Sequence, residues 1–296
     1  MNISEGRDNS FLFELSRIIG SVPDCFLLSC SSDPDHHRSV FTFAGDPEAV
    51  SRAAWEACRE SASRLDIRSH QGAHPRIGVV DVVPFVPLNN GGLDECTRRA
   101  HRLGKRIGAE LEIPVFMYGA AARIPERESL AELRRGGLKG AAARIRKLPP
   151  DYGPARLHPS AGAASVGARG YLIAYNINLA SSDLEAARDI ARRIRESNGG
   201  LPCVKALGLL LKSRNQAQVS MNLTDFHRTS IRTAFDTVAA MAGEKQISIA
   251  ESEIVGHVPR KALDEEDVEH LRLEDFEPSE TYIEDCLEKR INEVKN

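Results

Sequence analysis

The second half of the chain shows the clearest alternation of hydrophobic and polar positions. Residues 171–179, 203–211, 217–223 and 247–255 predict strands. Apolar residues recur at helical spacing in residues 183–195 and 227–241, which predicts two helices. The resulting order is β-α-β-β-α-β, the split βαβ or ferredoxin-like arrangement.

The first half almost repeats this order. A predicted helix at residues 11–19 precedes strands at 25–30 and 38–44, and the next helix begins at Asp46-Pro47, a capping residue followed by proline in the first turn. An extended run at 77–87, a helix at 93–111 and a strand at 115–118 follow. The first strand of a matching unit is absent from this prediction. We therefore expect either an open sheet edge or a truncated chain start.

These patterns predict an α/β (α+β) protein of two related subdomains, each with a sheet covered by helices on one face. The division is expected near Gly170, giving residues 1–170 and 171–263, with an acidic and partly helical tail at 264–296. Residues 147–169 are rich in Pro, Gly, Ala and Ser and show no predicted element. A stretch of this kind is either a binding loop or a flexible linker, and its larger residues, including Tyr152 and Arg156, favour the loop.

Composition narrows the class of protein. The 296 residues are 42% hydrophobic and 27% charged, as in ordinary globular enzymes. The net charge of −3 and the scattered basic residues argue against a nucleic-acid partner. No apolar run approaches the ~20 residues of a membrane span, and no signal segment is evident, so we expect a cytoplasmic protein without a membrane partner. The six cysteines lack metal-site spacing, which predicts no metal.

The segment SHQGAHPRIG, residues 69–78, holds the strongest candidate chemistry. His70 and His74 are four residues apart, a metal-ligand spacing on a helix, but Gly72 and Pro75 argue against that helix. The segment instead predicts a loop that carries His74 and Arg76 to the mouth of the following strand. Histidine in such a place can act as a general acid or base near neutral pH. An ordinary loop histidine is the alternative.

Polar residues also interrupt otherwise apolar strand patterns. Asp81 lies in VVDVVPFVP, where a buried carboxylate needs a partner. It either forms a structural salt bridge or backbone hydrogen bond, or it orients His74 or receives a substrate proton. In the second half, Asn176 and Asn178 lie on one face of a predicted strand, and Gln218, Ser220 and Asn222 on one face of another. Such faces are either solvated or line a wet cavity between two sheets.

Eight segments of the chain, in order, carry a family resemblance: SEGR (4–7), DPDHHRSVFTFAG (33–45), GAHPRIGVVDVVPF (72–85), PVFMYGAAAR (114–123), PDYGP (150–154), HPSAGAASVGAR (158–169), AYNINL (174–179) and AQVSMNLTDF (217–226). Over residues 4–263 the sequence resembles the formiminotransferase family, also called glutamate formimidoyltransferase, in its short form without a cyclodeaminase domain.

The resemblance implies transfer of a formimino group between formiminoglutamate and tetrahydrofolate, with folate as co-substrate and no metal. It implies a substrate tunnel between the two sheets, commonly in a homodimer. The family's catalytic histidine falls on His74, and Asp81 is the second catalytic candidate. The folate-binding stretch falls on Gly153, Pro154, Ala155, Arg156, Leu157, His158, Pro159, Ser160, Ala161 and Gly162. Because both substrates carry carboxylates, arginines from family-like segments are expected to bind them: Arg38, Arg76, Arg123 and Arg169.

The chain departs from the family pattern beside the presumed site. Ser29 and Ser31 stand where acidic residues are usual, and His37 stands where the family has Asn. Two alternatives therefore remain: formyl transfer between formyltetrahydrofolate and glutamate, and a folate-binding paralogue with weakened catalysis.

Overall fold

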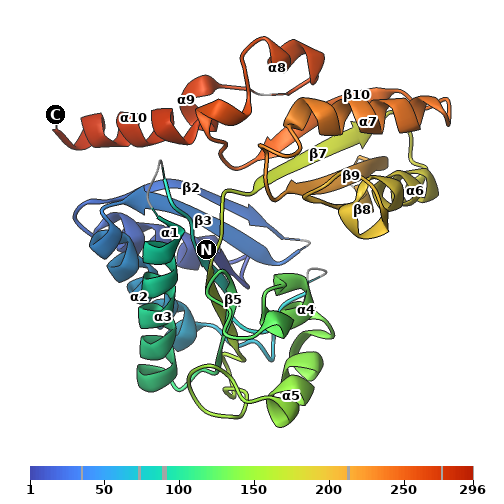
Figure 1. Cartoon of the computed structure of the whole chain (residues 1–296). Helices are drawn as coiled ribbons and strands as arrows, with labels where there is room; N and C mark the ends of the chain where they lie inside the picture. The colour runs from blue at the N-terminus through green and yellow to red at the C-terminus, as the bar shows by residue number, and fades with distance from the viewer. Residues whose placement is uncertain (35, 73–74, 89–91, 212–213, 275, 296) are drawn as a thin grey trace. The chain divides into compact units, whose positions relative to one another are not determined.

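A computed structural model describes residues 1–34, 36–72, 75–88, 92–211, 214–274 and 276–295. The chain divides into two compact units, Met1–Arg169 and Gly170–Asn296 (Figure 1). Each unit is built on its own sheet, with six strands in the first and four in the second.

The first unit begins with a complete ferredoxin-like motif. Its elements are β1 (Asn2–Ile3), α1 (Asn9–Gly20), β2 (Cys25–Asp33), β3 (Arg38–Gly45), α2 (Pro47–Arg64) and β4 (Val80–Phe85). The four strands pair antiparallel in the order β2-β3-β1-β4. The expectation that the first strand is missing is therefore wrong. β1 has only two residues, yet it lies inside the sheet, where Asn2 and Ile3 pair with both β3 and β4.

The rest of the first unit extends this sheet. It comprises α3 (Leu93–Glu110), β5 (Val115–Gly119), the 3-10 turn η1 (Pro125–Arg127), α4 (Leu130–Arg134), α5 (Gly137–Lys147) and β6 (Ala164–Ala168). β6 lies between β4 and β5 and runs parallel to both. Residues 147–169 are thus neither a linker nor a loop throughout, because their last part forms an interior strand. The glycines and alanines that hid this strand leave it fully buried.

Helices cover the first sheet on both faces (Figure 1). α1, α2 and α3 pack on one face through a large apolar core that includes Phe11, Trp55, Leu103 and Phe41. α4 and α5 cover the other face at the β4-β6-β5 end, in a smaller core of Ile77, Val82, Phe116, Tyr118, Leu133, Ala141, Ile145 and Ala163. The prediction of helices on one face alone is wrong for this unit.

The second unit has the predicted β-α-β-β-α-β order: β7 (Ile173–Leu179), α6 (Leu184–Ile194), the turn η2 (Glu196–Asn198), β8 (Val204–Leu211), β9 (Gln216–Leu223), α7 (Ile231–Gly243) and β10 (Ile249–Val255). The sheet is antiparallel in the order β10-β7-β9-β8. Both helices contribute to one core with the inward side chains of the strands. The predicted fold class is confirmed for both units, and the tunnel between their sheets stays a prediction.

The acidic segment after Leu263 packs onto the second unit. It contains α8 (Asp267–His270), α9 (Pro278–Thr281) and α10 (Ile283–Lys295), after the turn η3 (Arg260–Ala262). Leu271 and Tyr282 are buried in the core of that unit, and single bridges join Ser252 to Leu273 and Val258 to Tyr282. The prediction of a partly helical tail corresponds to these three helices.

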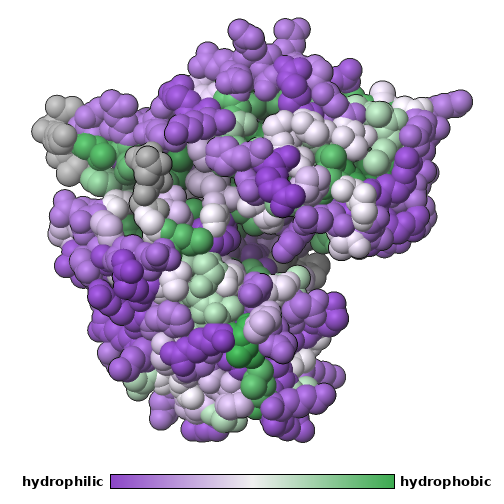
Figure 2. Space-filling model, viewed as in Figure 1, coloured by the Kyte–Doolittle hydropathy of each residue, from purple (hydrophilic) through white to green (hydrophobic). Residues whose placement is uncertain are grey.

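The surface in view is mainly hydrophilic, with smaller hydrophobic areas between the hydrophilic ones (Figure 2). Among the described residues, the exposed large apolar side chains are Phe13, Leu93, Leu148, Leu207 and Val255. No helix in the described ranges combines the length and apolar character that a membrane crossing requires.

Candidate active site

The loop predicted to carry the catalytic histidine connects α2 to β4. His74 and its neighbour Ala73 lie outside the described residues, so only the flanks of the loop can be described. Residues 69–72 and 75–76 are not helical. These flanks agree with the predicted loop and give no support to a helical pair of metal-ligating histidines.

Arg76 fastens the two flanks of this loop to each other. Its guanidinium donates hydrogen bonds to the carbonyl oxygens of Gly72 at 3.0 Å and His70 at 2.8 Å. Burial lowers the pKa of Arg76 below its usual value, and the charge of Asp81 opposes part of that shift. Arg76, predicted to bind substrate, therefore already shapes the backbone on either side of His74.

The turn between β2 and β3 contacts the same loop through His37. His37, which has a left-handed backbone (φ 51°), places Nε2 3.0 Å from Glu5 Oε1 and Nδ1 3.2 Å from the Gln71 carbonyl oxygen. Its ring stacks on His70, with ring centroids 4.1 Å apart. His70 Nε2 in turn lies 2.6 Å from the carbonyl oxygen of His37, so this nitrogen carries a proton. The two imidazoles join the turn to the loop.

Gly72 allows the backbone of the loop to approach that turn. A Cβ atom at this position would lie 2.2 Å from the carbonyl oxygen of His36. Glu5, which contacts His37 of this turn, is itself held in place because it accepts hydrogen bonds from the backbone N–H groups of Gly6, Arg7 and Asp8. Partial burial raises the pKa of Glu5, but the backbone N–H groups of Asp8 and Arg7, together with His37, outweigh the effect of burial and hold this pKa below its usual value.

Asp81 has partners on three sides. Its Oδ1 accepts the backbone N–H of Ile77 at 3.1 Å, and its Oδ2 forms ion pairs with Arg38 at 3.3 Å and Arg134 at 2.5 Å. The carboxylate is 2% exposed. The partner required by the sequence pattern is thus found, but Arg134, on α4, had no sequence signal beyond the need of a buried carboxylate for a cation.

The predicted folate-binding stretch lies directly beside the residues that lead from the loop of His74 into β4. The backbone N–H of Val79 donates to the carbonyl oxygen of Ala161 at 3.0 Å, and that of Ala163 donates to Ile77 at 2.8 Å. The N–H of Ile67 donates to the Ser160 carbonyl oxygen at 2.7 Å. Two segments about eighty residues apart in the chain are therefore brought together.

Two glycines make this approach possible. Gly162 has a positive φ of 74°, and a Cβ there would lie 2.5 Å from the Ile77 carbonyl oxygen. Gly78 forms a bridge with Gly162, and a Cβ on it would lie 2.0 Å from the Ala163 carbonyl oxygen. A side chain at either position would force the two segments apart.

Within the stretch, His158 closes a tight turn. Its backbone exchanges hydrogen bonds with Gly162, and its Nδ1 accepts the backbone N–H of Ala161 at 3.0 Å. The neutral ring therefore carries its proton on Nε2. Gly153, Ala155, Arg156 and Pro159 are exposed, while Pro154, Leu157 and Ser160 are half-buried. The stretch thus presents a partly open surface on a rigid frame.

Asp151, in the PDYGP motif, anchors the chain just before the stretch from Gly153 to Gly162. Asp151 Oδ2 accepts the backbone N–H of Met117 at 2.8 Å and pairs with Arg127 at 2.6 Å. Both side chains of the pair are nearly inaccessible, at 3% and 5% exposed. The adjacent Tyr152 hydroxyl bonds to His101 and Arg123, and the Arg123 guanidinium lies over the Tyr152 ring. Arg123, predicted to bind substrate, lies in this contact.

In the second unit, the amide-bearing strand faces form a hydrogen-bonded network. Asn176 donates to Glu253 at 2.8 Å, and Asn178 donates to Glu251 at 2.7 Å. Gln218 donates to both Asn178 and Glu253. Asn176, Asn178 and Gln218 of the predicted polar faces are therefore linked to carboxylates of β10. Asn222, on the same face as Gln218, is exposed.

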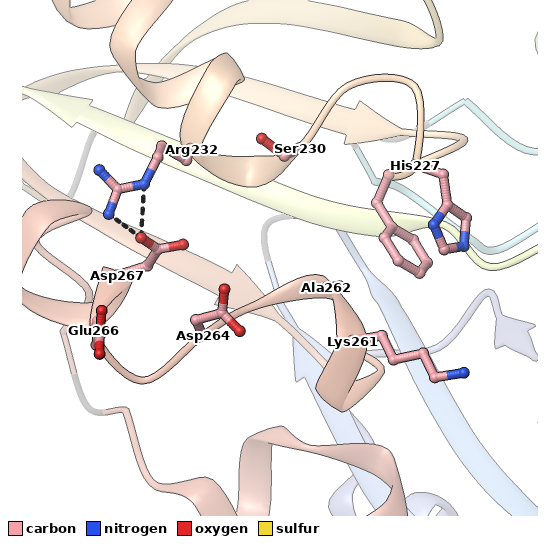
Figure 3. A pocket seen from close by; sticks show the side chains of 9 residues that line it. His227, Ser230, Arg232, Lys261, Ala262, Asp264, Glu266 and Asp267 are labelled. Carbon is pink, nitrogen blue, oxygen red and sulfur yellow. Dashed lines mark hydrogen bonds and ion pairs between the residues drawn. The ribbon is translucent and has the colours of Figure 1, made fainter.

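A cavity of about 430 Å³ also lies in the second unit, between the start of α7 and the segment from η3 to α8 (Figure 3). Arg232 and Asp267 form an ion pair at one end, and Lys261 extends on the same side as His227 at the other. Asp264 and Glu266 also line it. None of the predicted site residues that the structure describes lies in this cavity.

No group of three or more His, Cys, Asp or Glu side chains with the arrangement of a metal site occurs in the described part of the chain. The described cysteines are unpaired thiols, and burial raises the pKa of Cys25 to about 11 and that of Cys58 to about 12. Neither thiol is poised as a nucleophile near neutral pH.

Known proteins resemble the chain over nearly its whole length. A family model described as "Formiminotransferase domain, N-terminal subdomain" matches residues 1–169, and one described as "Formiminotransferase domain" matches residues 174–286. A glutamate formimidoyltransferase from Streptococcus pyogenes is 38% identical, covering 97% of this chain and 96% of that protein. One from Thermoplasma acidophilum is 40% identical, covering 98% and 97%.

A longer relative matches over part of its length. The formimidoyltransferase-cyclodeaminase of Rattus norvegicus is 39% identical over 88% of this chain, which corresponds to 50% of that protein. Both family models and both relatives of similar length agree with the segments by which the sequence resembles a known family. The chain belongs to the formiminotransferase family.

Proposed function

We propose that this protein transfers a formimino group between formiminoglutamate and tetrahydrofolate, giving formiminotetrahydrofolate and glutamate. The observation that carries the proposal is the adjacency, within one unit, of the histidine loop and the stretch from Gly153 to Gly162. Two full-length relatives that are named glutamate formimidoyltransferase support the same reaction.

The reaction requires one group that moves protons. The folate amine attacks the amidine carbon, a tetrahedral intermediate forms, and the glutamate nitrogen leaves as an amine. A proton must be removed from the attacking nitrogen and a proton delivered to the leaving one. We propose that His74 does both, because an imidazole holds either protonation state near neutral pH. This chemistry requires no metal or redox group.

The other residues of the proposed site bind and position. Arg76 sets the backbone around His74 through the carbonyl oxygens of His70 and Gly72. Folate is proposed to lie on the stretch from Gly153 to Gly162. Asp81, already committed to two arginines and a backbone N–H, is proposed to act through those arginines rather than as a proton acceptor.

Turnover with each donor tests this proposal. Purified protein should consume formiminoglutamate only when tetrahydrofolate is present, and His74→Ala should abolish that activity without changing the melting temperature. Full activity in the variant would remove His74 from the mechanism.

The same preparation separates the two alternatives. Formyl transfer from formyltetrahydrofolate to glutamate, with no use of formiminoglutamate, would replace the proposed reaction. Folate binding in calorimetry without turnover of either donor would indicate a binding paralogue. We also propose a cytoplasmic homodimer, which gel filtration with light scattering would test.

A further inference from the structure

A histidine in the predicted folate-binding stretch has one ring nitrogen without a partner among the described residues. His158 is half-buried, and its Nε2 atom forms no hydrogen bond with the part of the chain that the structure describes. Nε2 is not one of the buried polar atoms that lack a partner, so this side of the ring reaches the surface. A ligand that lies on the stretch can therefore contact Nε2.

The opposite ring nitrogen is occupied by the turn itself. Nδ1 of His158 accepts the backbone N–H of Ala161 at 3.0 Å. The backbone nitrogen and the hydroxyl oxygen of Ser160 lie 3.4 and 3.5 Å from the same atom. A ring nitrogen that accepts a hydrogen bond carries no proton, so the proton of the neutral imidazole is on Nε2. Nε2 is therefore a hydrogen-bond donor and not an acceptor.

The turn sets the orientation of this donor before any ligand binds. The backbone N–H of His158 donates to the Gly162 carbonyl oxygen at 2.9 Å, and the N–H of Gly162 donates to the His158 carbonyl oxygen at 3.0 Å. Pro159 has a fixed φ and restricts the backbone of the residue before it. Because the ring is already held by Ala161, little side-chain entropy is lost when a ligand accepts a hydrogen bond from Nε2.

The same turn is hydrogen-bonded to both ends of the histidine loop. Before the loop, the backbone N–H of Ile67 donates to the Ser160 carbonyl oxygen at 2.7 Å. After the loop, the N–H of Val79 donates to the Ala161 carbonyl oxygen at 3.0 Å. Ala161 thus joins the imidazole ring, through its N–H, to the backbone at the exit of the loop. The donor belongs to the part of the stretch that adjoins the proposed reacting centre.

A neutral N–H donor at this place suits an uncharged acceptor of folate. The carboxylates of folate belong to a tail that an aromatic ring separates from the reacting nitrogen, and a carboxylate gains more from a cationic partner. In the reduced pterin ring, the C4 carbonyl oxygen is close to the reacting nitrogen, because a single ring carbon separates that nitrogen from the carbonyl carbon. This oxygen is therefore the acceptor that best matches Nε2.

We propose that Nε2 of His158 donates a hydrogen bond to the C4 carbonyl oxygen of tetrahydrofolate and so positions the reacting nitrogen at the histidine loop. This inference rests on the proposed function for the identity of the ligand. It gives His158 a binding role that is separate from the proton transfer assigned to His74. It also makes His158 a determinant of specificity, because an amino group at C4 would bring one donor against another and leave both unpaired.

Calorimetry with two folates tests the assignment. The 4-amino-4-deoxy analogue of tetrahydrofolate has an amino group in place of the C4 oxygen and also lacks the hydrogen on N3. The wild-type protein should bind this analogue about 10- to 100-fold more weakly than tetrahydrofolate, the range expected when a partly buried donor loses its acceptor. Variants of His158 isolate the part of this ratio that belongs to the histidine, since they leave the contacts of N3 unchanged.

Two substitutions separate the donor from the turn. In His158→Asn, the side-chain oxygen can replace Nδ1 as the acceptor for Ala161, but no group replaces Nε2. This variant should keep the melting temperature, bind tetrahydrofolate about 10- to 100-fold more weakly and lose the discrimination between the folates. In His158→Gln, the amide reaches the place of Nε2 and can present either its nitrogen or its oxygen. This variant should melt at a lower temperature, keep its affinity for tetrahydrofolate and bind the analogue more tightly than the wild type does.

The matched control is His270→Asn, the same substitution on α8 in the second unit. The side chains of His270 and its partner Asp236 are 41% and 51% exposed. This variant should bind both folates as the wild type does. In turnover, His158→Asn should raise KM for tetrahydrofolate and leave KM for formiminoglutamate unchanged, which a general loss of structure would not do.

Two results would overturn the assignment. One is wild-type discrimination between the two folates in a folded His158→Asn or His158→Gln variant. The other is an equal loss of affinity for both folates in His158→Asn, which would show that His158 only shapes the turn. A wild type that binds no tetrahydrofolate would overturn this inference together with the folate-binding stretch. A wild type that binds tetrahydrofolate but turns over no donor would remove only the proposed reaction, and the two folates would still decide the role of His158.

Discussion

Replacing Asp151 by alanine should strongly destabilise the first unit. Asp151 and Arg127 form an almost inaccessible ion pair, and the same Asp151 oxygen accepts the backbone N–H of Met117 in β5. Arg127 also donates to the carbonyl oxygen of Pro149. In the variant, the guanidinium keeps its charge in a buried position, and the Met117 N–H loses its acceptor.

The expected loss follows from these contacts. Removing one partner of a buried ion pair costs about 3–5 kcal/mol, since the remaining charge is left uncompensated. The unsatisfied N–H adds about 1–3 kcal/mol, which overlaps with the first cost. We therefore expect Asp151→Ala to lower the free energy of unfolding of the first unit by about 4 kcal/mol, a large part of the 5–15 kcal/mol typical of a domain.

Urea unfolding followed by tryptophan fluorescence measures this loss. Trp55 is the single tryptophan of the sequence and is buried in α2, so its signal reports on the first unit alone. The double variant Asp151→Ala, Arg127→Met should recover part of the loss, because no charge then remains buried. Glu14→Ala, which breaks the exposed pair with Arg17, should leave the midpoint almost unchanged.

A loss smaller than about 1 kcal/mol in Asp151→Ala, at an unchanged denaturant slope, would refute this reasoning. It would mean that water reaches Arg127 and screens its charge. Greater stability in the double variant than in the wild type would show that the ion pair serves specificity rather than stability.

Two further predictions concern the frame of the site. Gly162→Ala should lower the free energy of unfolding of the first unit by about 2 kcal/mol and weaken folate binding, because Gly162 has a positive φ and the Ile77 carbonyl oxygen is close. The control is Gly20→Ala, at a position with open space around it, which should leave the free energy of unfolding unchanged in the same urea assay. Burial lowers the pKa of His70, so below about pH 6.5 the unfolded chain binds a proton that the folded protein does not, and stability is lost as the pH falls towards the folded pKa. His70→Gln, which can keep a donor to the His37 carbonyl oxygen, should reduce that loss in melting curves at pH values between about 5 and 7.5; an unchanged pH dependence would show that His70 does not contribute.

Hydrophobic periodicity predicted most of the long elements because each of them buries one face; the helix α5, which buries only Ala141 and Ile145, was not predicted. α2 begins where Asp46 and Pro47 indicate, and Asp46 accepts the backbone N–H groups of Glu48 and Ala49. β1 and β6 escaped for physical reasons. β1 has only two residues, too few to show an alternating pattern. The side chains of β6 are mostly small and have little strand propensity, and all five residues are buried, so no polar residue alternates with them.

The site was predictable only in part. The loop of His74 could be located from Gly72 and Pro75, and Asp81 was recognisable as a carboxylate that needs a partner. The arginines that form ion pairs with Asp81 could not be identified from the sequence. Arg134, one of them, is the last residue of a short helix, and its sequence context is that of a surface residue. The close approach of Gly78 and Gly162 depends on backbone geometry. A single glycine in a sequence does not indicate which other segment its backbone will approach.

The position of β6 sets the order in which the first unit can form as the chain is synthesised. The four antiparallel strands β1 to β4 are all made once residue 85 has left the ribosome. β5 pairs only with β6 within the described sheet, so β5 must wait for residues 164–168 before it has a partner. During that interval β4 presents an unpaired edge to neighbouring nascent chains, and such edges promote misassembly. Slower translation between residues 120 and 168 should therefore increase aggregation of newly made protein, even though the finished fold is unchanged.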